Sequence, residues 1–281
     1  MSEVPFSRRH GLFGPRVGTL IHDDAPNSVR TKLVEFLSSL NLSNLGADFN
    51  GVKLHSLFCQ VTGDIPLGLE NWGNGHLAFG EAKQLIYKCK WFHFYEIVEE
   101  LAQLLRKRDP RHGTLFAIEM NETFTTRGIG WQLVDAKVVT RGDEAFEHTI
   151  KVAEQELANR QTTRTRIQEA INDLSRRPEP DLAGAISHAF AAMECIIGDI
   201  KYTSEEIRES THHTFGSFLQ KHVDLFPSED FKEGFQRLWR YANNEGSRHG
   251  KEGVEPARDE AELIVSLAAA LVTYLNRRHP K

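Results

Sequence analysis

The stretch Asp181-Leu-Ala-Gly-Ala-Ile-Ser-His-Ala-Phe-Ala-Ala-Met-Glu-Cys-Ile-Ile-Gly-Asp199 predicts a helix that belongs to a packed bundle. It follows the chain-breaking Pro178-Glu-Pro180, and the Asp181 side chain is suited to cap a helix that starts after it. Seven residues of the stretch are alanine or glycine. Because small side chains let helix axes approach closely, we expect neighbouring helices to pack tightly against this one.

Segments without any β-strand pattern lie on both sides of this helix. We predict helices over Glu144–Asn159, Thr163–Leu174, Phe215–Val223 and Ser228–Tyr241, and a final helix that Pro256 opens. Four or five such helices are enough to form a bundle. The second domain is therefore predicted to be helical and to span residues 143–281.

The first half of the chain carries helical patterns and one β pattern. Apolar residues at three-to-four spacing predict helices over Val29–Leu40, Val52–Val61, Phe79–Arg106 and Leu115–Thr125, the first with Asn27 or Ser28 as its N-cap. Gly128–Thr140 predicts two short strands joined at Asp135-Ala136. The glycine-rich first twenty residues suit a packed arm. The fold class is therefore mainly α, with a helical N-terminal domain, residues 1–142, that carries a small β-hairpin.

Composition limits the classes of partner. The 281 residues carry a formal net charge of −5 and a pI of about 6.2, so polyanions must be recognised by local clusters of basic residues. Cys59, Cys89 and Cys195 lie far apart, which argues against a disulfide framework and a zinc site. The amino terminus lacks an apolar core segment, and the longest apolar run, Leu263–Leu275, is too short to span a bilayer. We expect a cytoplasmic protein that inserts into no membrane.

The stretch Tyr241-Ala-Asn-Asn-Glu-Gly-Ser-Arg-His-Gly250 carries the clearest chemical signal. It sets Arg248 beside His249 in a glycine-bounded turn between two predicted helices. An imidazole that titrates near neutral pH can move a proton, and a guanidinium can bind a phosphate through two donors. The pair is therefore suited to RNA phosphodiesters. The structural alternative is that both residues only cap a helix or form surface ion pairs.

Glu194 is the acidic candidate for the same site. It lies in an otherwise apolar, small-residue helix, where a carboxylate is rarely buried without a partner. Pairing with Arg248 or His249 would satisfy it, either at a catalytic site or as a buried structural tie. No paired helical spacing of metal ligands and no phosphate-binding glycine loop occurs, so we predict no metal and no cofactor.

Three stretches in the first half resemble a known family. Phe6-Ser-Arg-Arg-His-Gly11, Val29-Arg-Thr-Lys-Leu33 and Asn121-Glu-Thr-Phe-Thr-Thr-Arg-Gly-Ile-Gly130, with the hairpin that follows, resemble the AbiJ-type abortive-infection N-terminal domain of the fourth subtype. This resemblance implies a role in phage exclusion.

The second half is similar to HEPN domains. The similar stretches are Leu174-Ser-Arg-Arg177, Ala185-Ile-Ser-His-Ala-Phe-Ala-Ala-Met-Glu194, Thr214-Phe-Gly216 and Gly246-Ser-Arg-His249. This resemblance implies a helical bundle that pairs into dimers and acts as a metal-independent ribonuclease. The chain departs from the family hallmark, Arg-x4–6-His, because His249 follows Arg248 directly. A literal Arg-x-x-x-x-His occurs at Arg208-Glu-Ser-Thr-His-His213, in a polar connection.

The hypothesis drawn from the sequence is a phage-defence effector that cleaves RNA. His249 moves a proton, Arg248 stabilises charge on the phosphate, and Glu194 orients one of them. Secondary RNA-binding candidates are Arg240, Arg208 and His213. Expected partners are RNA, a second copy of the chain bound through the helical domain, and a defence-system protein. The alternative is a non-catalytic interaction or sensor module; an antitoxin or transcriptional regulator has less support because no recognition helix is evident.

Two groups of basic residues could serve either nucleic-acid binding or a structural role. The run Arg106-Lys-Arg108, with Arg111 and His112, is either a nucleic-acid patch or compensation of a helix dipole. A second set follows along the entry of the second domain and either lines an RNA path or forms a solvated face: Arg160, Arg164, Arg166, Arg176 and Arg177.

Overall fold

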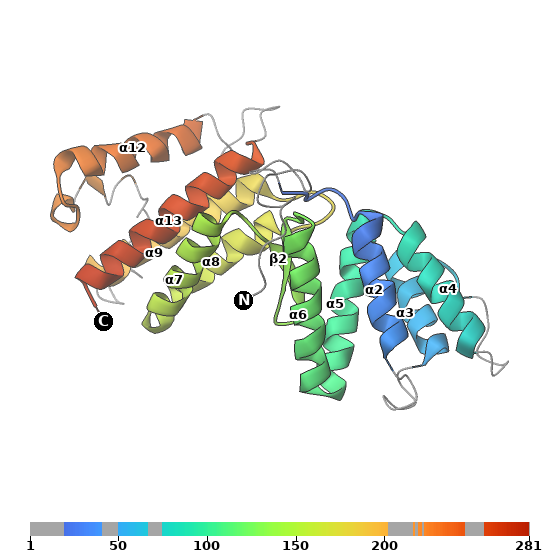
Figure 1. Cartoon of the computed structure of the whole chain (residues 1–281). Coiled ribbons are helices and arrows are strands. Elements are labelled where there is room, and N and C mark those ends of the chain that lie inside the picture. The colour runs from blue at the N-terminus through green and yellow to red at the C-terminus, as the bar shows by residue number, and fades with distance from the viewer. Residues whose placement is uncertain are drawn as a thin grey trace, which may run out of the picture. The chain divides into compact units, whose positions relative to one another are not determined.

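The computed structural model describes residues 20–40, 50–66, 75–201, 216, 219–220, 222–244 and 256–280. The chain divides into two compact units, Met1–Arg141 and Gly142–Lys281. The described residues form ten α-helices and a single two-stranded sheet (Figure 1). The prediction of a mainly α chain with a small β-hairpin in its first half is confirmed. The predicted arm at the amino terminus and the loop at residues 71–74 lie outside the described residues.

The described residues of the first unit form five helices: α2 (Asn27–Ser39), α3 (Gly51–Thr62), α4 (Gly75–Lys88), α5 (Trp91–Arg108) and α6 (Pro110–Thr126). Helix α3 packs against α4, α5 against α6, and α2 against both α4 and α6. The long helical pattern after Phe79 is divided between α4 and α5, with a break at Cys89-Lys90. Their apolar faces meet in one core, in which Leu33, Phe58 and Phe94 have no exposed surface.

The start of α2 corrects one prediction. Neither Asn27 nor Ser28 caps this helix; the N-cap residue is Pro26, which makes no side-chain bond. Its carbonyl oxygen accepts from the backbone N–H groups of Val29 and Arg30. The Arg30 side chain is buried and donates to the carbonyl oxygens of Ala25, at 2.6 Å, and Ile86, at 2.5 Å. The entry of α2 is therefore fixed by an internal arginine, which a capping pattern does not reveal.

The hairpin forms where the sequence predicts it. Strands β1 (Trp131–Val134) and β2 (Lys137–Thr140) pair antiparallel, with Trp131 opposite Thr140. Asp135 and Ala136 have φ values of 49° and 63°, the left-handed conformation that tight two-residue hairpin turns require at both central positions.

Side chains of the neighbouring helices cover both edges of this hairpin. The Asn121 amide on α6 bonds both the N–H of Leu133, at 2.7 Å, and its carbonyl oxygen, at 2.9 Å. Glu99 on α5 accepts from the N–H of Val138 at 2.6 Å. Gly130 leaves room for His22, because a Cβ at that position would lie 2.2 Å from the ring. Much of the 121–130 motif thus positions the hairpin.

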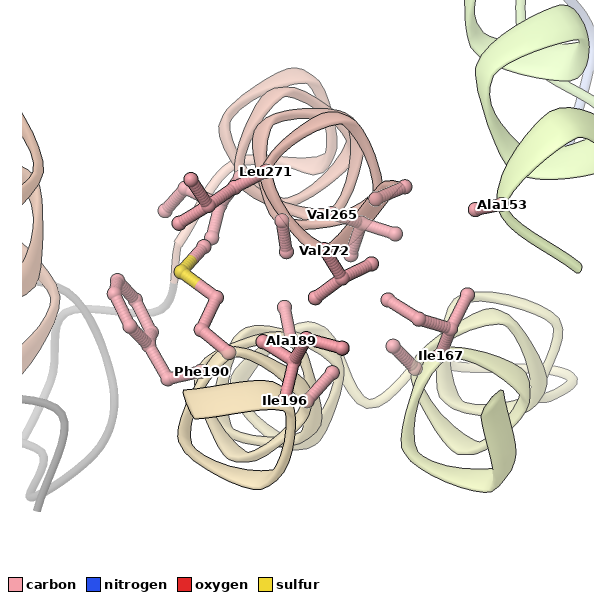
Figure 2. Close-up of a cluster of buried hydrophobic side chains, with 14 of the residues drawn as sticks. Ala153, Ile167, Ala189, Phe190, Ile196, Val265, Leu271 and Val272 are labelled. Carbon is pink, nitrogen blue, oxygen red and sulfur yellow. The ribbon is translucent and has the colours of Figure 1, made fainter. Parts of the chain in front are cut away.

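The second unit is a helical bundle. Its elements are α7 (Glu144–Glu156), η3 (Leu157–Asn159), α8 (Gln161–Leu174), α9 (Leu182–Lys201), η4 (Val223–Leu225), α12 (Glu229–Asn244) and α13 (Arg258–Arg278). Helix α9 packs against α8 and α13, and α13 also packs against α7. In Figure 2, Ala189 and Ile196 of α9 face Val272 of α13. The small residues of α9 permit this close packing, as predicted.

Helix α9 resembles a membrane-spanning helix in its length and composition. Its 20 residues are long and apolar enough to cross a bilayer, and half of its apolar window is buried inside the unit. Core helices of soluble proteins share these features. The sequence analysis considered only Leu263–Leu275 in this respect and did not single out α9.

Candidate functional site

Two of the six predicted site residues lie in the described part of the chain, namely Glu194 on α9 and Arg240 on α12. Arg248, His249, Arg208 and His213 lie outside the described residues. The predicted convergence of Arg248, His249 and Glu194 therefore stays a prediction.

Glu194 is partly buried on α9. Six residues separate it from His188, which corresponds to a rotation of about 120° around the helix axis at 3.6 residues per turn. On its own side of α9 it shares a face with Phe190 and Lys201, and Lys201 forms an ion pair with Asp224 of η4.

Arg240 is exposed near the end of α12. On the same helix Arg237, also exposed, lies 3.5 Å from Glu233. The position of Arg240 is compatible with binding an anion from solvent, but nothing in the described part of the chain joins it to Glu194.

A second group of functional side chains lies between α8 and α9, and we call it the α8–α9 cluster. Its members are Arg166, Glu169 and Asp173 from α8 and His188 and Cys195 from α9. The two helices pack closely against each other, and residues three or four apart on one helix lie on the same face of it. The cluster combines an imidazole, a guanidinium and two carboxylates.

Asp173 and His188 form its centre. Asp173 is 3% exposed, and its carboxylate lies 2.7 Å from Nδ1 of His188 and 3.0 Å from Nη2 of Arg176. Since an ionised carboxylate only accepts hydrogen bonds, Nδ1 carries a proton, and Nε2 is the accepting nitrogen of the neutral ring. The buried aspartate thus fixes both the tautomer and the orientation of the imidazole.

The other ring nitrogen faces Glu169. Nε2 of His188 lies 3.6 Å from Oε2 of Glu169, beyond hydrogen-bond distance. The same carboxylate oxygen accepts from Nη1 of Arg166 at 2.7 Å. Arg166 and His188 keep 40% and 31% of their side chains exposed. A guanidinium and an imidazole therefore face one carboxylate oxygen at a surface that solvent reaches.

The start of α9 is shaped around the same aspartate. Asp181 accepts from the N–H of Gly184 at 2.7 Å and thereby caps the helix, as the sequence predicts. Arg176 joins Asp173 and Asp181 by ion pairs. A Cβ on Gly184 would lie 2.6 Å from Asp181 Oδ2 and 2.8 Å from Asp173 Oδ2. The glycine therefore allows both carboxylates to approach the first turn of α9.

Cys195 does not supply a nucleophile to this cluster. Burial raises the pKa of its thiol, and although Arg166 lowers the pKa, Asp199 and Glu194 raise it. The nucleophilic form of cysteine is the thiolate, which these surroundings disfavour. Among these side chains, the His188 imidazole is the group suited to proton transfer.

The sequence patterns did not predict this cluster. The available signal was the pair Glu169 and Asp173, one helical turn apart, in a segment whose neighbouring helix carries one histidine. Among the described residues, no group of three or more His, Cys, Asp or Glu side chains could hold a metal ion.

The other basic residues that the sequence singled out differ in their burial and in their partners. Arg160 is 3% exposed and donates to Oδ1 of Asn276 at 2.7 Å and to the carbonyl oxygen of His279. The interpretation of Arg160 as part of an RNA path or a solvated face is therefore wrong; it fastens the end of α13 to the start of α8. In the first unit, Arg106 pairs with Asp135 and Arg111 with Asp109.

Comparison with known proteins gives one match. The family model described as AbiJ N-terminal domain 4 matches residues 5–156, which is more than half of the chain. The matched region covers nearly all of the first unit and continues through α7. No curated protein and no solved structure matches the chain.

Proposed function

The chain belongs to the AbiJ N-terminal domain 4 family, and we propose that it is a cytoplasmic abortive-infection effector that cleaves RNA without a metal ion. The family match over residues 5–156 is the observation that carries the role in defence. The cleaving activity is assigned to the helical second unit, because its sequence resembles HEPN domains.

The proposed reaction uses residues of the connection between α12 and α13. These helices end at Asn244 and begin at Arg258, so Arg248 and His249 lie in the chain between them. His249 transfers the proton of a ribose 2′-hydroxyl or of the leaving oxygen, and Arg248 stabilises charge that develops on the phosphate. Glu194 orients one of the two. Arg240, Arg208 and His213 provide additional contacts to RNA.

The proposed assembly is a homodimer formed through the helical unit. A symmetric dimer sets two Arg248–His249 pairs in one surface, so that one RNA strand meets both. A protein of the same defence system is the proposed source of regulation.

Inducible expression in a bacterial host tests this function. We expect the wild-type chain to arrest growth, alone or on phage infection, and to fragment total RNA. The variant Arg248→Ala/His249→Ala should lose both effects, whereas the control Arg237→Ala, which alters an exposed arginine of α12, should keep them. RNA fragmentation by the double variant equal to that by the wild type would contradict the catalytic roles assigned to Arg248 and His249.

A non-catalytic interaction module is the second candidate. Several charged side chains of the second unit are already engaged in ion pairs, Arg166 with Glu169 and Arg176 with Asp173, as in a purely architectural network. Unfolding measurements on Glu194→Ala and Arg248→Ala separate the two functions. Removing one partner of a buried ion pair costs about 3–5 kcal/mol, whereas a catalytic pair that faces solvent can be removed with little loss of stability.

A further inference from the structure

We propose that His188 is a general base for RNA cleavage by this chain, with Asp173 as its positioning residue and Arg166 as the neighbouring phosphate-binding cation. The inference rests on the proposed RNA cleavage and assigns the 2′-hydroxyl proton to His188 in place of His249, on the face of α9 that meets α8. This face is distinct from the side of α9 that carries Glu194.

The first argument is orientation. The Asp173 carboxylate is buried and lies 2.7 Å from Nδ1, so the proton on this nitrogen is fixed. Arg176, at 3.0 Å, holds the same carboxylate in place and balances its charge. A base that must accept a proton through Nε2 needs this tautomer, and a rigid helix pair supplies it without the flexibility of a loop.

The second argument is access to the accepting nitrogen. Nε2 makes no hydrogen bond within the described part of the chain, and its nearest polar neighbour is Oε2 of Glu169 at 3.6 Å. Almost a third of the His188 side chain is exposed. A substrate hydroxyl therefore reaches Nε2 from solvent without displacing an existing bond.

The third argument is the local charge. Glu169, Asp173 and Asp181 carry three negative charges, and Arg166 and Arg176 carry two positive charges. The charged groups around His188 therefore leave a single net negative charge. Arg166 donates hydrogen bonds to Glu169 and to Cys195, and a guanidinium has five N–H donors, so others remain for a phosphate oxygen. Because Arg166 is the one cation among the five members of the α8–α9 cluster, most of the affinity for RNA must come from other parts of the chain.

The proposed step is a balanced transesterification. Nε2 of His188 takes the proton of the ribose 2′-hydroxyl, and the 2′-oxygen forms a bond to phosphorus. The bond between phosphorus and the 5′-oxygen breaks, and the departing oxygen takes a proton from water. The products are a 2′,3′-cyclic phosphate and a 5′-hydroxyl, and the imidazolium returns its proton to solvent.

The competing interpretation is a structural role, in which His188 only joins α8 to α9. Both roles predict some loss of stability on substitution, but only the base predicts a change in the pH profile of cleavage. The charged groups that face the ring, directly or through one partner, are Glu169, Asp173, Arg166, Arg176 and Asp181, all from α8 or from the turn before α9. The decisive comparison of pH profiles is therefore between the wild type and His188→Gln, which leaves these five charged groups in place.

The experiment measures single-turnover cleavage of a labelled single-stranded RNA by the purified full chain, in EDTA, between about pH 5 and pH 9. We expect His188→Gln to lower the rate by about 10²–10⁴-fold at neutral pH, with RNA affinity unchanged. The loss of rate at acid pH that protonation of His188 causes in the wild type should disappear. Asp173→Asn should lower the rate and displace this acid limb, and His148→Gln, an exposed histidine of α7, should behave as the wild type.

Each outcome decides the proposal. Cleavage by His188→Gln at the wild-type rate, or with an unchanged acid limb, overturns the role of His188 while the proposed function stands. If the wild type cleaves no RNA, the proposed function fails and this inference fails with it. If His188→Gln does not melt cooperatively, His188→Ala with added imidazole replaces it: recovery of the rate supports the base, and no recovery overturns it.

Discussion

At the scale of single residues, several side chains that hold elements together bond partners that lie far away in the sequence. The Asn121 side chain bonds the backbone of Leu133 as a neighbouring strand would. Arg160 bonds Asn276 and His279, which lie 116 and 119 residues later in the sequence. Neither contact follows from local periodicity, because both partners lie on other elements. This is why Arg160 was misassigned and why His188 was not predicted.

Asn121→Ala tests the first of these contacts. The substitution leaves the N–H and the carbonyl group of Leu133 without their partner, so we expect the free energy of unfolding to fall by about 1–3 kcal/mol. Glu122→Ala, at the exposed neighbouring position, should change it by less than about 0.5 kcal/mol. Urea denaturation of both variants checks this, and equal stability would show that the amide bonds do not hold the hairpin.

Glu262 predicts a dependence of stability on pH. Burial raises the pKa of this carboxyl, and Arg258, at 3.4 Å, only partly opposes the shift. The native state therefore binds more protons than the unfolded state from about pH 4 upward, and Glu262 lowers stability as pH rises. We expect Glu262→Gln to gain stability relative to the wild type between pH 4 and pH 7.

Glu156, in the same unit, gives a pH dependence of stability of the opposite sign to that of Glu262. Hydrogen bonds from Arg277 lower the pKa of its carboxyl, so its stabilising effect is present at neutral pH and is lost as pH falls. Glu156→Gln should therefore lose stability at pH 7 and match the wild type at strongly acid pH. Denaturant melts at several pH values measure both variants, and parallel pH curves for all three proteins would contradict the two assignments.

At the scale of elements, the sequence predicted most helices and the hairpin, and the packing explains what it missed. Three-to-four spacing locates a helix because its buried face repeats with the helical turn. The hairpin is visible because two β-type runs are separated by two residues, Asp135-Ala136, which is the length of a tight hairpin turn. The association of α8 with α9 depends on contacts between whole faces. The α8–α9 cluster becomes visible only after these faces are paired.

Two glycines in helices of the first unit test how tightly elements pack. A Cβ on Gly113 of α6 would lie 2.8 Å from the Cα of Arg106 on α5, whereas a Cβ on Gly80 of α4 meets no atom within 4 Å. We expect Gly113→Ala to destabilise the unit by about 1–3 kcal/mol, because the backbones of α5 and α6 must separate. Gly80→Ala should instead stabilise it by about 0.5–1 kcal/mol through helix propensity. Thermal melts that shift in the same direction for both variants would refute the close approach of α5 and α6.

At the scale of the whole molecule, the family match and the compact units end at different places. The match continues to Glu156, but α7 packs against α13 and buries Phe146 and Ala153 in the core of the second unit. The family region therefore includes the first helix of the helical bundle. A division of the chain by family match alone would remove α7 from its packing partners.

Truncated chains test this division. A fragment of residues 142–281 should unfold cooperatively, and a fragment of residues 157–281 should be less stable by roughly 3 kcal/mol or more, because it loses the buried Phe146 and exposes α13. The loss of the Glu156–Arg277 pair adds to this. Circular dichroism melts of both fragments check the prediction, and equal melting temperatures would show that α7 is dispensable to the bundle.

The central claim, that the second unit cleaves RNA through proton transfer to and from histidine, is tested most directly by the ends of the RNA products. Purified protein is incubated with RNA in EDTA, and the fragment termini are identified. The account predicts fragments with 2′,3′-cyclic phosphate and 5′-hydroxyl ends, formed by the wild type and not by variants of the catalytic histidines. Intact RNA, or fragments with 3′-hydroxyl and 5′-phosphate ends, would contradict it.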